Sequence, residues 1–193
     1  MNIKLPAWRY VEIEDLASTI LLNHTDLTLP FNPESIAKSL GIVTIDIGDL
    51  KLSREELKDK LANNSAFCDG FCVQMPDQKL IFTNNSWFPL ARDRYTFGHE
   101  IGHLELGHTQ ESDLSEIEAN VFSRSLLSPF GIAMTFSEEQ LTPNYFMDAF
   151  GLSMKAAYYA VKRTRNRKNY EDEVSETTIR LRNAFLEKEG GVM

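Results

Sequence analysis

The chain has little of what marks secreted, membrane-spanning or disulfide-built proteins. It contains only two cysteines, Cys68 and Cys72, in 193 residues, too few for a disulfide framework or a four-cysteine zinc site. Four residues apart in an expected strand, they are also too distant for an easy disulfide, so we expect two small buried residues. The N-terminus lacks an apolar segment of signal-peptide length, and no run of about 18 apolar residues occurs. The sequence therefore predicts a cytoplasmic protein without a membrane span.

Positive charge is also scarce. The chain has 20 Lys and Arg against 28 Asp and Glu, a net charge of −8 at pH 7, which argues against bulk binding of nucleic acid. Its 42% apolar and 25% charged residues are close to the globular average, which excludes disordered and fibrous classes. No repeat, low-complexity segment or long linker divides the chain. We expect one domain over residues 1–170, with a helical C-terminal extension of the same domain over 171–193.

Apolar spacing and helix-capping signals predict an α+β fold. A helix start at Asn32 and Pro33, a capping box from Ser53 to Glu56 and a turn at Pro76-Asp77 set several boundaries. Helices are expected over 8–23, 35–40, 53–62, 89–107, 114–127, 137–150, 154–167 and 175–186, and strands over 42–47, 66–75 and 79–84. The result is a small β-sheet followed by a mainly helical C-terminal half.

One pentapeptide carries metal chemistry. His99-Glu100-Ile101-Gly102-His103 lies in an expected amphipathic helix, where residues four apart share one face. Both imidazoles can then reach one metal ion, with Glu100 beside the place of a reacting water molecule. This is the HExxH pattern of zinc hydrolases, in which the glutamate is the general base. The alternative is a pair of core histidines with satisfied hydrogen bonds.

A catalytic zinc needs a third protein ligand and one open position. His108 does not fit the metzincin pattern, because it follows His103 by five residues where that pattern requires six. We instead interpret His108 as a partner of the helix C-terminus or a surface residue.

The preferred third ligand comes from the next helix. Glu116 and Asn120 are four residues apart and share a face of that helix. Glu116 can complete a His₂Glu site. Asn120 can hydrogen-bond one of the metal ligands without binding the metal itself. Glu118 is the second choice, since it points about 160° away from Glu116. An acidic helix start alone would suggest only a solvated surface.

The mechanism of such a site follows from zinc chemistry. Zinc lowers the pKa of bound water and polarises the scissile carbonyl, and Glu100 takes the proton and passes it to the leaving amine. The sequence leaves the oxyanion donor open among Tyr95, Tyr145, Tyr158 and Tyr159.

The blocks around these residues resemble the ImmA/IrrE metallopeptidases. Residues Arg92 to Leu104 are similar to that family's R-x-R-[FY]-T-x-[AG]-H-E-[LI]-G-H-L block. Its second block is matched by Glu116-x-Glu118-Ala119-Asn120-x-Phe122 and Leu126-Leu127-x-Pro129, and its opening by Leu29 to Ala37. The resemblance covers about residues 8–168 and departs at Ser128, where Met is common, and at His108, one residue later than usual.

The resemblance implies a zincin-like metallopeptidase with one zinc ion on His99, His103 and Glu116 and with Glu100 as the base. It also implies that the substrate is a helix-turn-helix repressor of a prophage, mobile element or stress regulon. We therefore expect a zinc-dependent endopeptidase that relieves repression by cleaving such a protein.

Two alternatives stay open. The protein could be a non-proteolytic anti-repressor that only binds a repressor, although binding gives no physical need for Glu100. It could also contact DNA through the basic helix 155–168, which resembles the second helix of a helix-turn-helix and carries Lys155, Lys162, Arg163, Arg165, Arg167 and Lys168. That stretch could equally be a solvated face or a dock for an acidic partner.

Overall fold

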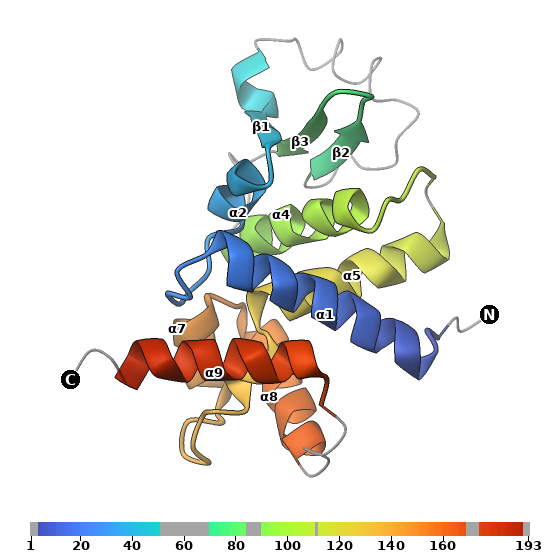
Figure 1. Cartoon of the computed structure of the whole chain (residues 1–193). Helices are drawn as coiled ribbons and strands as arrows, with labels where there is room; N and C mark the ends of the chain where they lie inside the picture. The colour runs from blue at the N-terminus through green and yellow to red at the C-terminus, as the bar shows by residue number, and fades with distance from the viewer. Residues whose placement is uncertain (1–3, 51–69, 84–89, 111, 169–173, 191–193) are drawn as a thin grey trace.

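The structure is a computed structural model that describes residues 4–50, 70–83, 90–110, 112–168 and 174–190. A three-stranded sheet lies at one end, and helices form the rest of the molecule (Figure 1). The expected helix 53–62, the first residues of the expected strand 66–75 and Cys68 lie outside the described residues. No helix in the described ranges is long and apolar enough to cross a membrane.

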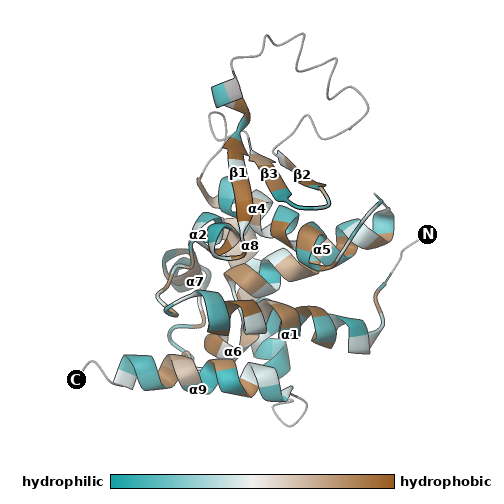
Figure 2. Cartoon of the chain, turned by 45° about the horizontal axis from the view of Figure 1, so that its top comes forward, coloured by the Kyte–Doolittle hydropathy of each residue, from teal (hydrophilic) through white to brown (hydrophobic). Residues whose placement is uncertain are grey.

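The sheet has the order β1-β3-β2. Its strands are β1 (Ile42–Asp46), β2 (Gly70–Gln74) and β3 (Lys79–Thr83). β1 is parallel to β3, and β2 is antiparallel to it with Cys72 opposite Ile81. The expected hairpin is confirmed, and a 3₁₀ turn, η1 (Ile47–Leu50), follows β1 directly. Figure 2 shows hydrophobic residues along all three strands. β2 and β3 pack on the helix beneath them.

That helix is α4 (Leu90–Glu105), and α5 (Asp113–Leu127) packs along it. α4 buries Phe97, Ile101 and Leu104, whereas Leu90 at its first position is 75% exposed. α5 begins at Ser112, whose hydroxyl accepts a hydrogen bond from the backbone N–H of Ser115. Its first turn therefore faces the end of α4, which brings Glu116 toward the histidines.

Two N-terminal helices cover this pair. α1 (Ala7–His24) lies along α5, and α2 (Pro33–Ser39) packs on β1 and α4. Asn32 caps α2 as expected, since its side chain accepts from the N–H groups of Glu34 and Ser35. The helices expected over 8–23 and 35–40 are thus confirmed.

The C-terminal helices are α6 (Phe130–Ala133), α7 (Pro143–Phe150), α8 (Met154–Lys168) and α9 (Glu176–Gly190). The expectation of one helix over 137–150 is wrong. α7 begins only at Pro143, because the Thr142 hydroxyl caps it and proline takes the first helical position. α9 packs against α1 and α6 and buries Leu181 and Phe185 in the common core. The α+β class with a small sheet and a mainly helical C-terminal half is confirmed.

Candidate metal centre

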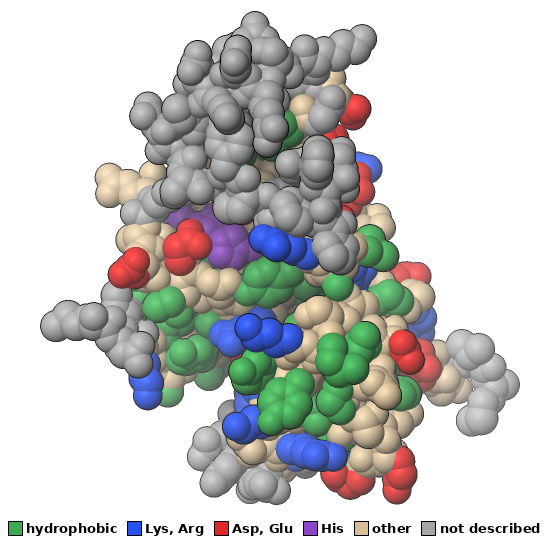
Figure 3. Space-filling model, turned by 180° about the vertical axis from the view of Figure 1, so that it is seen from behind, with side chains coloured by type: hydrophobic (Ala, Val, Ile, Leu, Met, Phe, Trp, Pro, Cys, Tyr) green, Lys and Arg blue, Asp and Glu red, His purple; other side chains and the backbone are tan. Residues whose placement is uncertain are grey.

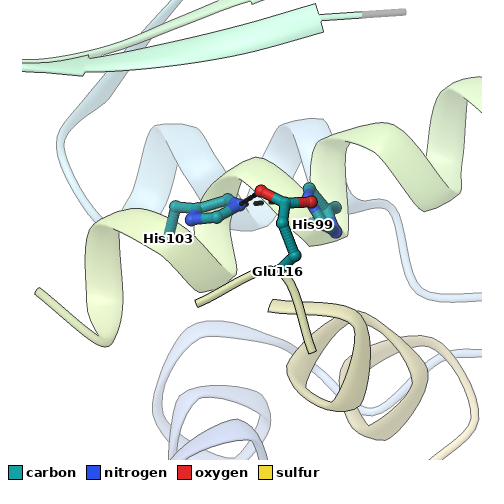
Figure 4. Close-up of side chains that lie close together, drawn as sticks. All are labelled: His99, His103 and Glu116. Carbon is teal, nitrogen blue, oxygen red and sulfur yellow. Dashed lines mark hydrogen bonds and ion pairs between the residues drawn. The ribbon is translucent and has the colours of Figure 1, made fainter. Parts of the chain in front are cut away.

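His99 and His103 lie on one face of α4, one turn apart, and their Nε2 atoms are 3.0 Å from each other. Glu116, in the first turn of α5, points its carboxylate at both rings (Figure 4). Its Oε2 is 3.3 Å from Nε2 of His99, and its Oε1 is 3.2 Å from Nε2 of His103. The three ligand atoms all lie within 4.8 Å of one another, so these residues could hold one metal ion.

The chemistry of these donors fits a metal. Burial lowers the pKa of His99 and of His103, the latter to about 4, so both rings are neutral at pH 7, the form that binds metals. The Nδ1 of His99 is buried and has no hydrogen-bond partner, which argues against two core histidines with satisfied hydrogen bonds. Two imidazoles and one carboxylate are the three protein ligands of an open catalytic site. Glu116 is half exposed, leaving that side open to a substrate.

Two glycines of α4 allow α5 to approach closely enough to supply Glu116. A Cβ on Gly102 would lie 3.0 Å from the Phe122 ring and 3.2 Å from the Ala119 Cα. A Cβ on Gly98 would lie 2.7 Å from the Ser123 Oγ, which donates to the Tyr95 carbonyl at 2.9 Å. The glycines inside and before the HExxH pattern therefore set the distance between the two ligand-bearing helices.

Glu100 is buried, with 7% of its surface exposed, and Cys72 of β2 lies beside it. Burial, and then the charge and hydrogen bond of Glu100, raise the pKa of the Cys72 thiol, so the thiol is protonated. Cys72, expected to be buried, is only partly buried; it is a free thiol packed against the core. The contact shows that β2 passes over the residue expected to be the general base.

Of the two roles expected for His108, the surface position is wrong, and a partnership with the C-terminus of α4 stays a prediction. His108 is not a surface residue: its Nδ1 lies 3.0 Å from the Nδ1 of His103, and its Nε2 lies 3.0 Å from Oε2 of Glu118. Because the Glu118 carboxylate can only accept, His108 donates to it from Nε2 and accepts at Nδ1 from His103. This order of protons leaves the Nε2 of His103 unprotonated and ready to bind a metal.

Glu118, which binds His108, is itself held by Arg9. Arg9 of α1 donates to both of its carboxylate oxygens, at 2.7 and 2.8 Å. The hydrogen bonds of Arg9, and then of His108, lower the pKa of Glu118 to about 2. Glu118, the second choice as ligand, is therefore engaged with Arg9 and His108, whereas Glu116 faces the histidines. No local pattern predicts the contact between Arg9 and Glu118, because Arg9 lies in a different helix.

Asn120 and Tyr95 flank the histidines on the other side. Asn120 donates from Nδ2 to the backbone carbonyl of Glu116 at 2.7 Å, and its Oδ1 accepts from the Tyr95 hydroxyl. It thus fixes the turn that carries Glu116 and does not hold the carboxylate itself. The Tyr95 ring lies 6.3 Å from the His99 ring, between centroids.

The other three tyrosines named from the sequence lie elsewhere. Tyr145 packs on Phe136 and accepts from Gln140, and the rings of Tyr158 and Tyr159 meet edge to face on the exposed side of α8. Of the four, Tyr95 is the one beside the metal site.

Most cations of the basic helix 155–168 are engaged by the protein itself. Arg163, Arg165 and Lys168 donate to the backbone carbonyls of Ser128, Leu141 and Phe136. Arg167 binds both carboxylate oxygens of Glu14, at 2.6 and 2.9 Å. Of the six, Lys155 and Lys162 are the two with neither a hydrogen bond nor an ion pair among the described residues.

Comparison with known proteins agrees with this geometry. The chain matches the Peptidase_M78 family model, described as the IrrE N-terminal-like domain, over residues 39–162. Comparison with curated proteins finds no match. The match includes the sheet, α4, α5 and the HExxH pattern, and it confirms the resemblance to the ImmA/IrrE metallopeptidases. With its zincin-like fold and its His₂Glu group, the chain belongs to the IrrE/M78 family and is a metalloprotease of that family.

Proposed function

We propose that the protein is a zinc-dependent endopeptidase that cleaves a helix-turn-helix repressor. The observation that carries the catalytic part is the convergence of His99, His103 and Glu116 at one point, with the buried Glu100 adjoining it in α4. The family supports zinc as the ion and a protein as the substrate. The repressor as substrate rests on the likeness to ImmA/IrrE proteins.

Zinc held by these three residues would polarise the scissile carbonyl and lower the pKa of a water molecule to the neutral range. Glu100 would act as the general base, taking a proton from the attacking water and passing it to the leaving amine. Its burial under β2 keeps bulk water away from the carboxylate and strengthens its interactions. Tyr95 is our candidate for the oxyanion donor, since its hydroxyl lies on Asn120 beside His99.

The sheet offers a way to hold the substrate. β2 is the last strand in the order β1-β3-β2, and its outer edge pairs with no strand in the described part of the chain. A peptide that added to this edge would form backbone hydrogen bonds independent of sequence. Because Cys72 of β2 lies beside Glu100, such a peptide would pass the general base.

The two alternatives receive less support. A protein that only binds a repressor has no need for a buried carboxylate next to a metal site. DNA contact through 155–168 would rely mainly on Lys155 and Lys162, because the other four cations bind within the protein. Few phosphate contacts give weak, nonspecific affinity.

The test is co-expression with the helix-turn-helix repressor encoded next to the protein. Wild type is compared with Glu100→Gln and, as a matched control, with Glu34→Gln, which changes an exposed carboxylate of α2. We expect cleavage by wild type and Glu34→Gln and none by Glu100→Gln. Derepression without cleavage that persists in Glu100→Gln would refute the protease and support the anti-repressor.

A further inference from the structure

A second feature adjoins the metal centre, a cavity of about 1030 Å³ between α5 and α8, with residues of α4 at one end. This is at the upper end of the size of ligand pockets, roughly 300–1,000 Å³. Its walls include the apolar side chains of Leu127, Leu152, Ala156 and Ala160. None of its lining residues among those described is Asp or Glu. Six of them are basic: Arg92, Arg124, Lys155, Lys162, Arg163 and Arg167.

Most of this positive charge is not compensated within the described part of the protein. Arg167 has Glu14 as its partner. Arg124, Lys155, Lys162 and Arg163 form no ion pair in the described ranges. The chain as a whole carries −8, so a cluster of cations in one concave site is a marked local reversal of charge. Such a site attracts anionic groups and focuses the field on them.

Arg163 shows that the charge is built into the cavity wall. Its Nη2 donates to the carbonyl of Ser128 at 3.1 Å and to its Oγ at 3.3 Å, while its Nε is buried without a partner. Burial, and then the nearby charge of Arg124, lower the pKa of Arg163 to about 10. A carboxylate in the cavity would offset the repulsion among these guanidinium groups.

The cavity lies next to the place of catalysis. Tyr95 lines it, and the same tyrosine contacts Asn120 and lies beside His99. Arg124, one turn after Asn120 on α5, donates to the Asn120 carbonyl at 3.1 Å. Figure 3 shows histidine surface on the same face of the molecule as basic side chains interleaved with hydrophobic ones. A peptide crossing the metal centre can therefore continue into the cavity.

We propose that this cavity is a specificity subsite that binds an acidic segment of the substrate protein, with apolar side chains among its carboxylates, on one side of the scissile bond. The inference rests on the proposed protease function, and it names the chemistry by which the substrate is selected. A lining that combines apolar side chains with cations fits leucine- or valine-like side chains flanked by Asp or Glu. DNA fits less well, because the site is concave and partly apolar, whereas a duplex needs a broad, exposed basic surface.

Binding is measured separately from cleavage by using the full-length Glu100→Gln protein loaded with zinc. The probe is a fluorescein-labelled peptide in which glutamates alternate with leucine and serine, compared by anisotropy with the same peptide carrying glutamine. The test variant adds Arg124→Gln and Lys162→Gln, both exposed side chains that can change without disturbing the core. The control adds Arg180→Gln and Lys38→Gln, which remove the same charges from exposed sites on α9 and α2.

We expect the glutamate peptide to bind at least about tenfold more tightly than the glutamine peptide. The double change at Arg124 and Lys162 should weaken the glutamate peptide by about tenfold, roughly threefold for each partly exposed pair, and leave the glutamine peptide unchanged. Equal affinity for the two peptides, or equal loss in the control, would overturn the subsite. So would a DNA duplex that binds tightly and loses affinity in the same variant.

A second measurement separates this inference from the protease function. Wild type and Glu100→Gln are each incubated with a peptide mixture from digested cell protein, and new termini are identified by mass spectrometry. Cleavage with acidic residues enriched on one side of the bond supports both proposals. Cleavage without that preference refutes only the subsite. If wild type produces no cleavage while the glutamate peptide still binds, the protease proposal fails and the anion site stands.

Discussion

A Glu118→Gln variant tests the contacts that run from His103 through His108 to Glu118. The quantity measured is the free energy of unfolding as a function of pH. Glu118 is buried between Arg9 and His108, and these contacts lower its pKa from the usual 4.5 to about 2. A carboxyl whose pKa is lower in the folded state stabilises the fold above pH 4.5. That stability is lost as the pH falls through the folded value near 2.

The size of the effect follows from that difference. A shift of about 2.5 pKa units corresponds to roughly 3.4 kcal/mol at 1.36 kcal/mol per unit. Arg9 is about a quarter exposed, so solvent screens its charge and we expect about 2 kcal/mol in practice. Glutamine retains an oxygen that can accept from His108 but has no charge for Arg9. Glu118→Gln should therefore lower the free energy of unfolding by about 2 kcal/mol at pH 7.

The assay is urea denaturation of the metal-free protein from pH 7 down to pH 2.5. Stability of wild type should decline toward that of Glu118→Gln below pH 4.5, so the gap between the curves narrows on acidification. Titration of the carboxyls and histidines that do not contact Glu118 is common to both proteins and cancels in the difference. Glu34→Gln, which breaks only an exposed pair with Lys38, should change stability by less than about 0.5 kcal/mol. A gap that stays constant with pH would refute the assignment of Glu118.

Further outcomes follow from the same geometry. His108→Leu removes the acceptor for Nδ1 of His103 and should weaken zinc binding about 10–100-fold, measured by competition with a chromogenic chelator. Metal analysis should find no stoichiometric zinc in Glu116→Gln, while Glu118→Gln retains it. The reverse result would make Glu118 the metal ligand in place of Glu116. Chelation of zinc should lower the melting temperature of wild type but not of Glu116→Gln. Gly102→Ala should destabilise by about 1 kcal/mol, because the clash with Phe122 and Ala119 outweighs the helix propensity of alanine; Gly190→Ala, with open space around its added Cβ, should cause no loss.

The sequence predicted those parts of the site that depend on local spacing. The i, i+4 relation of His99 and His103, and the place of Glu116 at the start of the next helix, follow from helix geometry alone. The caps at Asn32 and Pro33 placed α2 correctly for the same reason. The roles of these residues as ligands and base remain predictions until the variants above are measured.

What the sequence did not predict arises from contacts between distant segments. His108 was interpreted as a partner of the helix C-terminus or a surface residue, because nothing local showed that α1 brings Arg9 to Glu118, 109 positions away in the chain. Arg94, part of the family block, donates to the carbonyls of Phe31 at 2.6 Å and Phe150 at 3.1 Å. It therefore links α4 to two distant segments, a role that spacing alone cannot reveal. The cavity beside α8 likewise exists only once α5 and α8 are packed together.

These long-range contacts also bear on which part of the chain makes up the peptidase. The family match begins at residue 39, yet Arg9 holds the carboxylate that sets the proton order of His108 and His103. α1 also buries Ile13, Ala17 and Leu21 in the core shared with α5, and Glu14 of the same helix holds Arg167 at the cavity wall. One helix outside the matched segment thus supports both the metal centre and the proposed subsite. We infer that the catalytic unit begins at α1, because a segment starting at residue 39 would lack Arg9, which binds Glu118, and Glu14, which binds Arg167.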